Sequence, residues 1–289
     1  MASSSFTTKR IRVSLTLASG QFGANLGNEK IVEGLRVECS IEKGGEPSKN
    51  ACKLKIYGMV FSDMMQLANL GIKNPLAIRN NRVRVEAGDA SRMSIVFQGE
   101  AADIHAEFVQ GSVCLVVDAL AGYYASCVPA APSSTSGKVP VANKMATLAK
   151  SMGYSFEDSG VTSWVTNPYL VGSFMRQAQA LAKAANIEFG IDDGVLFIAP
   201  RGTPRISHNA VIIAPDTGMH DYPVVSKKGL VVSSIFDPNF KLNGVIKVEG
   251  SLVVNANGLW RVHGLKHELS CENPGGRWET VLTATKIGA

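Results

Sequence analysis

Two histidines, His263 and His267, have the residue type and spacing closest to a metal site in this 289-residue sequence. Their segment alternates like a strand, and a period of two would put both imidazoles on one face unless Gly264 introduces a bulge. A zinc site needs one or two further ligands, and no Cys/His pair with ligand spacing lies nearby. Structural, hydrogen-bonded histidines are therefore the favoured interpretation, and the sequence predicts no metal.

Other candidate chemical groups have simpler structural explanations. Asp192-Asp193-Gly194 could bind calcium or supply a catalytic carboxylate, but a tight hairpin turn already explains both acids and the glycine. Cys114 lies in an apolar run, which predicts a buried, inert thiol rather than a nucleophile. No P-loop, serine nucleophile elbow or His-Glu-x-x-His pattern occurs. The sequence therefore predicts a non-enzymatic protein without a cofactor.

The charge pattern bears on nucleic-acid binding. The formal net charge is +5. The nearest approach to a basic cluster is made by Arg79, Arg82, Arg84 and Arg92. The aromatic side chains that could stack on bases are Phe22, Phe61, Tyr123 and Tyr124. Basic and aromatic residues are not interleaved, so a solvated or subunit-facing surface and core packing are favoured over contact with a nucleic acid, which stays the alternative.

The cysteines and the ends of the chain indicate the compartment. The five cysteines are scattered without a CxxC pair, which favours reduced thiols and a reducing compartment: Cys39, Cys52, Cys114, Cys127 and Cys271. No apolar run approaches the roughly 20 residues that cross a bilayer. Residues 1–10 are polar and show no secretory signal, so we expect a loose arm and synthesis in a cytoplasm.

Strand patterns dominate the first region of the chain. Residues 11–17 and 81–86 alternate between apolar and polar, as half-buried antiparallel strands require. Apolar residues from Phe61 to Ala68 recur at helical spacing, and Gly71 is placed where it could cap the end of that helix. We expect a barrel or sandwich carrying one short helix.

A Pro/Ser-rich segment, residues 128–138, predicts a linker or exposed loop. Two helices should follow, one from Val141 to Met152 and one from about Pro168 to Ala185, where Asn167 supplies the start signal. Asp193-Gly194 between alternating runs predicts a hairpin. Residues 139–200 therefore form a small α+β module.

The chain returns to strands after residue 200. An extended run over residues 229–236 ends at Asp237-Pro238-Asn239, and later turns are predicted at Asn257-Gly258 and at residues 274–276. The simplest topology is a meander. The fold class predicted for the whole chain is α+β and predominantly β.

Several segments together resemble the hub proteins of phage baseplates, a family whose fold recurs in type VI secretion spike proteins. Residues 54–58, 82–88 and 95–100 resemble the family's first tube-like domain, where a strand ending in Phe-x-Gly begins a long hairpin. Residues 229–235, 237–239 and 242–244 resemble its strand, Asp-Pro turn and glycine. Residues 260–262, 265–269 and 275–280 resemble its closing strand pair. The residues that carry the resemblance are Phe97, Gly99, Asp237, Pro238, Gly244, Trp260, His267 and Trp278.

The resemblance implies a division of the chain. It adds a first tube-like antiparallel β-barrel at 11–127 and a second barrel at 201–289 to the flexible arm at 1–10, the linker at 128–138 and the α+β module at 139–200 that the composition and patterns predict. Residues 200–228 match no family motif, so the start of the second barrel is the weakest boundary.

The resemblance also implies a function. A homotrimeric ring would present a pseudo-sixfold face to the tail tube and a threefold face to a central spike, beside other baseplate proteins. The ring would leave a conduit for tape-measure protein and DNA within the virion, with no membrane binding of its own. Two alternatives remain open from the residues: a nucleic-acid-binding β-barrel module and a tail-associated cell-wall hydrolase, although neither a carboxylate pair nor a metal site is visible for the latter.

Overall fold

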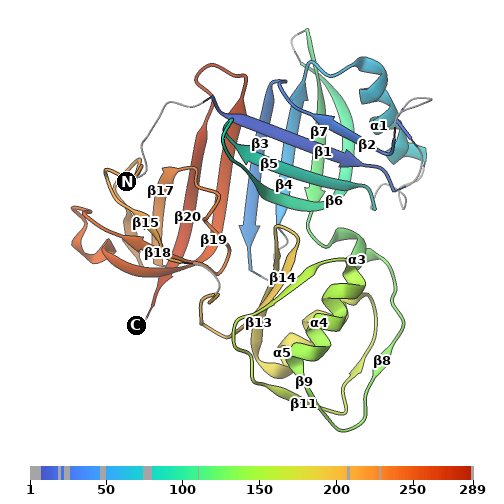
Figure 1. The fold of residues 1–289 in the computed structure, drawn as a ribbon, viewed down its shortest axis with the longest axis vertical. Coiled ribbons are helices and arrows are strands. Elements are labelled where there is room, and N and C mark those ends of the chain that lie inside the picture. The colour runs from blue at the N-terminus through green and yellow to red at the C-terminus, as the bar shows by residue number, and fades with distance from the viewer. Residues whose placement is uncertain are drawn as a thin grey trace. The chain divides into compact units, whose positions relative to one another are not determined.

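The computed structural model describes residues 8–18, 21–22, 27–45, 50–73, 80–109, 111–206, 209–227 and 229–287. It is mostly β, with a few helices, which confirms the predominantly β α+β class (Figure 1). The chain divides into two compact units, and β3, β19 and β20 contribute residues to both. None of the helices in the described residues is long and apolar enough to cross a bilayer.

The first unit draws its residues from Met1–Ile41, Ala51–Leu120 and His267–Trp278. Its strands hydrogen-bond in the order β3-β4-β7-β6-β5-β1-β2. Their bounds are β1 Arg10–Thr16, β2 Glu29–Val32, β3 Val37–Gly44, β4 Ala51–Tyr57, β5 Arg82–Gly88, β6 Met93–Val109 and β7 Ser112–Leu120. One helix, α1 (Phe61–Lys73), packs against β6.

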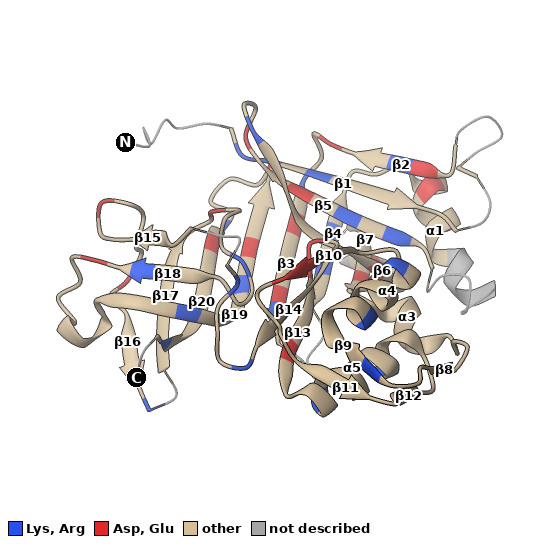
Figure 2. Ribbon diagram, turned by 60° about the horizontal axis from the view of Figure 1, so that its bottom comes forward, with Lys and Arg blue, Asp and Glu red and all other residues tan. Residues whose placement is uncertain are grey.

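Alternation along these strands places the core. Val13 and Leu15 of β1 are buried and face Val85 and Val83 of β5 across the antiparallel register. The residues between them point to the other face, which carries the arginines seen as blue segments on β1 and β5 in Figure 2. The predicted period-two strands of this region are therefore confirmed.

The predicted helix of the first region is longer than expected. Gly71 lies within α1 rather than beyond its end, because the helix continues to Lys73. Met64 and Ala68 of the predicted apolar stripe are buried, as is the neighbouring Leu67, whereas Phe61 at the start of the stripe is exposed.

The second unit comprises Glu42–Asn50, Ala121–Lys266 and Glu279–Ala289. Its first part contains α3 Tyr123–Cys127, β8 Ser133–Ser134, β9 Lys138–Pro140, α4 Val141–Met152, β10 Ser155–Asp158, β11 Trp164–Thr166, β12 Tyr169–Leu170, α5 Phe174–Ala185, β13 Ile187–Asp192 and β14 Val195–Pro200. A three-stranded sheet runs β10-β14-β13, with β10 and β14 parallel and β13 and β14 antiparallel. Helices α4 and α5 bury their apolar faces on it around Met145, Leu181 and Leu196.

The second predicted helix begins later than the sequence indicated. Asn167 has φ 49°, whereas an N-cap residue has extended backbone, and Tyr169–Leu170 forms β12 instead. The helix starts at Phe174, where Ser173 Oγ accepts a hydrogen bond from Arg176 N at 3.3 Å. Segment 128–138, predicted as a linker, carries β8 and the start of β9.

The C-terminal part of the second unit is a second strand assembly. Its elements are β15 Val211–Ile213, β16 Val224–Ser226, β17 Gly229–Ile235, β18 Val245–Val248, the short 3-10 helix η1 Val254–Ala256, β19 Gly258–Cys271 and β20 Trp278–Lys286. The order is β16-β17-β20-β19, with β18 beside β19 and β15 parallel to β18. The predicted meander is therefore wrong, because β17 and β18, consecutive in sequence, do not pair. Its core surrounds Trp260, Phe240 and Leu282.

Candidate functional site

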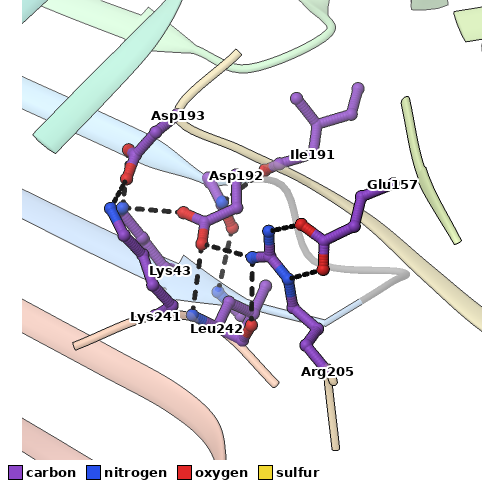
Figure 3. A network of polar contacts seen from close by, with 10 residues as sticks. Lys43, Glu157, Ile191, Asp192, Asp193, Arg205, Lys241 and Leu242 are labelled. Atoms are coloured by element: carbon purple, nitrogen blue, oxygen red, sulfur yellow. Dashed lines mark hydrogen bonds and ion pairs between the residues drawn. The ribbon is translucent and has the colours of Figure 1, made fainter. Parts of the chain in front are cut away.

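A group of charged, largely buried side chains of the second unit lies around the hairpin between β13 and β14. Asp193 (φ 51°) and Gly194 (φ 84°) occupy the two turn positions, both left-handed, as a type I′ turn requires. The turn holds two adjacent carboxylates, Asp192 and Asp193, toward Lys43 at the end of β3 (Figure 3). Lys43 Nζ donates to Asp192 Oδ1 and to Asp193 Oδ1, each at 2.7 Å.

An arginine and a second lysine extend this network. Arg205 Nη1 donates to Asp192 Oδ2 at 3.0 Å, and Arg205 Nε donates to Glu157 Oε1 at 2.9 Å. Lys241 Nζ lies 2.6 Å from Asp193 Oδ2. The side chains of Lys43 and Asp192 are each only 1% exposed, so these charges interact in a medium of low dielectric constant.

Backbone groups complete the surroundings of Asp192. Leu242 N donates to Asp192 Oδ2 at 3.3 Å, and the neighbouring Ile191 carbonyl accepts from Asn50 Nδ2 at 2.6 Å. Asn50 Oδ1 in turn accepts from Gly44 N at 3.1 Å. The network, defined here as Lys43, Glu157, Asp192, Asp193, Arg205 and Lys241, therefore joins the 42–50 segment, the α+β module and the 241–242 loop (Figure 3).

The protonation states follow from this geometry. Burial opposes the charge of Asp192, yet the attraction of Lys43, Lys241 and Arg205 outweighs it and lowers its pKa from 3.8 to about 2. Burial also opposes the charge of Lys43, but the two aspartates raise its pKa. Three cations balance three carboxylates, and each is bonded to an opposite charge. The network is therefore suited to hold these segments of the second unit together.

A basic cavity of about 570 Å³ lies in the same unit. Its apolar lining includes Phe189, Phe197 and Leu242, and its charged lining includes Arg261, which pairs with Glu188 at 2.6 Å. The remaining charged or titratable lining groups are Lys183, Arg201 and His263. Partial desolvation by its neighbours and the nearby Arg261 lower the pKa of His263, which is otherwise exposed, so this imidazole is neutral near pH 7.

Phe97 and Gly99 lie together on β6 in the first unit. Phe97 is buried, and a Cβ added at Gly99 would lie 2.8 Å from Phe97 Cζ and from the backbone carbonyl of Leu120. The strand therefore needs glycine where it passes close to β7, a requirement that the sequence alone does not reveal.

Asp237, Pro238 and Gly244 shape the loop between β17 and β18. Asp237 Oδ1 accepts from Asn239 N at 2.8 Å, which closes an Asx turn over Pro238. Gly244 N donates to Lys241 O at 3.0 Å, and a Cβ at Gly244 would meet that same oxygen at 3.0 Å. The loop thereby places Lys241 within ion-pair distance of Asp193 in the charge network.

Trp260 and His267 are buried residues of β19, in different units. Trp260 Nε1 donates to Ala256 O at 2.7 Å. Trp278, at the start of β20, is partly exposed, and Lys9 Nζ lies 5.7 Å from its ring centroid. The eight residues that carry the family resemblance (the signature residues) neither belong to the charge network nor line the cavity. They lie in both units, as packing and turn residues.

The two candidate metal-binding histidines do not converge. His267 is buried, whereas His263 is exposed, so the alternation changes phase between them, as a bulge at Gly264 would produce. Within the described part of the chain, no group of three His, Cys, Asp or Glu residues could hold a metal ion.

The predicted basic cluster is only partly described. Arg79 lies outside the described residues, Arg82 and Arg84 are exposed on β5, and Arg84 pairs with Glu86. Arg92 lies in the turn before β6, where its backbone N donates to Asp89 Oδ1 at 2.9 Å. Arg82, Arg84 and Arg92 therefore face solvent, and the charge of Arg84 is compensated.

The cysteines and aromatic side chains also have mainly structural environments. Cys114 is buried, and burial raises the pKa of its thiol, which agrees with the predicted inertness. Phe22 is buried in the core, whereas Phe61 and Tyr124 are exposed and Tyr123 is partly buried. The five cysteines are free thiols in the structure.

Sequence reasoning did not find the charge network. It explained Asp192 and Asp193 by the hairpin alone and did not consider Lys43, Glu157 or Arg205. The Asp-Gly turn was the one local pattern that pointed to this place in the chain. The partner Lys43 is 149 positions away from Asp192, so no local pattern connects the two residues.

Known structures share this fold. A tail protein from Neisseria meningitidis MC58 aligns with a TM-score of 0.60 and 10% identity over 96% of this chain and 97% of that one. The 43 kDa tail protein of prophage MuSo2 from Shewanella oneidensis aligns with a TM-score of 0.64 and 11% identity over 95% and 96%. The E. coli c3393 protein, a type VI secretion component described as similar to the T4 tail proteins gp27 and gp5, aligns at 0.55 and 8% identity over 95% and 77%.

These likenesses define the class of the fold as that of phage tail proteins and related secretion-system components. No curated protein matches the sequence at a significant level. The model of the baseplate hub gp41 family matches residues 10–274, and the chain belongs to that family. The resemblance seen in the sequence is thereby confirmed, and the protein is a tail baseplate component of the virion.

Proposed function

We propose that three copies of this hub protein form a ring that adapts a sixfold tail tube to a threefold central spike. The ring leaves a conduit through which tape-measure protein and DNA pass. Its neighbours are the tail tube protein, the spike and other baseplate proteins. The role is structural, without catalysis and without membrane binding, and the protein is made in the host cytoplasm before it joins the virion.

The observation that supports the trimer is an exposed, apolar strand at the end of a sheet in the second unit. Among the described strands, β16 is the last one of its sheet, and all three of its residues are exposed. Val224 is 63% exposed and pairs with Val231 of β17, which is 42% exposed; Ile235, four residues farther on, is 49% exposed. An apolar face beside an unpaired strand edge favours association with another chain, and homo-oligomers close such edges by symmetry.

Each copy would supply two similar tube-like barrels, at residues 11–127 and 201–289. An arm at 1–10, a linker at 128–138 and the module at 139–200 complete this division. Support comes from the two sets of mainly antiparallel strands, each with one buried apolar face. The eight signature residues would maintain the turns and close strand contacts of these barrels, as the environments of Gly99 and Gly244 suggest.

The oligomeric state tests the proposal. In analytical ultracentrifugation at micromolar concentration, we expect the mass of three chains for the natural protein. The variant Val231→Asp/Ile235→Asp should sediment as a monomer, because it buries two charges in the proposed interface. The matched control Phe108→Asp places a charge at a side chain that is 68% exposed in the other unit, and it should remain trimeric. A monomeric natural protein, or a trimer that the double variant leaves intact, contradicts this assignment.

A further inference from the structure

One edge of strand β13 carries backbone groups that no described strand pairs with. In the sheet β10-β14-β13, strand β13 is an outer strand, and its described partner is β14 alone. A two-residue turn makes Asp192 and Val195 a hydrogen-bonded pair, so Gly190 and Glu188 also bond to β14. Ile187 and Phe189 alternate with these residues and therefore direct their N–H and C=O groups away from β14. The carbonyl of Ile191, on the same edge, already accepts from an amide side chain.

The basic cavity lies along this edge. Its lining includes Phe189, which packs in the core beneath α5, and also Glu188 and Phe197, whose side chains point to the opposite face of the sheet. Since neighbouring residues of a strand face opposite sides, a cavity that touches both faces of β13 runs past its edge. Its volume of about 570 Å³ is that of an ordinary ligand-binding cleft.

The charges around the cavity select an acidic ligand. Arg261 is compensated by Glu188 at 2.6 Å. Lys183 and Arg201 are exposed, and no carboxylate in the described residues forms an ion pair with either. Arg201 Nη1 donates instead to the neutral amide oxygen of Asn186 at 3.1 Å. Two exposed cations of the lining therefore have no carboxylate partner among the described residues, while Phe189, Phe197 and Leu242 make another part of the lining apolar.

We propose that the edge of β13 receives an extended, acidic segment of a partner protein, which adds a strand to the β10-β14-β13 sheet. Backbone pairing with Ile187 and Phe189 would give affinity, and carboxylates next to Lys183 and Arg201 would give selectivity. A nucleic acid satisfies the cations but has no alternating donors and acceptors for the strand edge, so the geometry favours a peptide. The site lies within one chain and is independent of the ring of three copies.

Binding of a labelled peptide to the full-length protein tests the site. The probe is a fluorescent peptide of alternating Glu and Val, measured by anisotropy at about 0.15 M salt. The variant Lys183→Glu/Arg201→Glu should bind on the order of tenfold more weakly. The control Lys150→Glu/Arg176→Glu makes the same charge change at exposed helix positions outside the cavity and should leave the affinity within about twofold.

Two further probes separate strand pairing from simple charge attraction. A peptide of the same sequence with N-methyl groups at alternate positions keeps its charge but cannot donate to the strand, and it should not bind. An oligonucleotide of equal charge should not displace the unmodified peptide. The proposal is overturned if the unmodified peptide fails to bind, if the methylated peptide binds equally well, if the oligonucleotide competes, or if both double variants weaken binding alike.

Discussion

Replacement of Asp192 by asparagine should destabilise the second unit strongly. Asp192 is the carboxylate that Lys43 and Arg205 share, and the Asp192 and Lys43 side chains are each 1% exposed. Its lowered pKa, about 2 instead of 3.8, corresponds to about 2 kcal/mol of favourable interaction at neutral pH. Removal of one partner from a buried ion pair costs about 3–5 kcal/mol. We expect the lower end, about 3 kcal/mol, because Lys43 keeps Asp193.

Urea unfolding at pH 7, followed by tryptophan fluorescence, measures this loss. Asp192→Asn should lower the free energy of unfolding without a change in the urea slope. The matched control is Glu249→Gln, which breaks the exposed Lys247–Glu249 pair of the same unit, whose side chains are 46% and 44% exposed. That change should cost no more than about 1 kcal/mol. Equal, small losses in the two variants would refute the reasoning that the network is buried and tightly paired.

The same variant has a distinct pH dependence. Because the folded pKa of Asp192 lies below its unfolded value, its stabilisation is present above about pH 4 and disappears as the pH falls toward 2. The natural protein should therefore lose about 2 kcal/mol more than Asp192→Asn between these limits. A parallel decline of both proteins would show that Asp192 titrates normally.

Three more substitutions or reactions test other described contacts. Gly99→Ala should lower the free energy of unfolding by about 1–3 kcal/mol in a thermal melt, because its Cβ would lie 2.8 Å from three neighbouring heavy atoms. The control Gly27→Ala, where a Cβ meets nothing within 4 Å, should leave the free energy of unfolding nearly unchanged. Trp260→Phe leaves the buried carbonyl of Ala256 without its indole donor and should lower the free energy of unfolding in urea by about 1–3 kcal/mol. An unchanged free energy of unfolding would contradict the hydrogen bond. Iodoacetamide, with peptide mass mapping, should label partly exposed Cys127 well before Cys114, whose burial raises its thiol pKa; the reverse order would contradict the described core.

The elements that sequence reasoning predicted correctly are those whose causes are local. The period-two strands around Val13 and Val83 and the hairpin at Asp193-Gly194 depend on side-chain alternation and turn geometry within a few residues. The late start of α5 shows the limit of such signals. Asn167 before a proline has the composition of a helix start, but Asn167 adopts a left-handed conformation and the true cap is Ser173.

The charge network could not be predicted because its members meet only in the folded chain. Lys43 looks like an ordinary polar residue of an alternating strand, and Arg205 lies in a stretch without a recognisable pattern. Their burial follows from the segments that the fold brings together, not from neighbours in sequence. The parallel pairing of β15 with β18 was missed for the same reason, since nearest-neighbour topology favours a meander.

The division of the chain between the two units has a consequence for biosynthesis. The first unit requires residues 267–278, and the second requires residues 279–289. Synthesis must therefore reach residue 278 before the first unit has all its parts, and it must continue through β20 before the second has, although domains generally fold as they emerge. A chain that stops before residue 267 would lack pieces of both units at once, so neither unit could complete its fold.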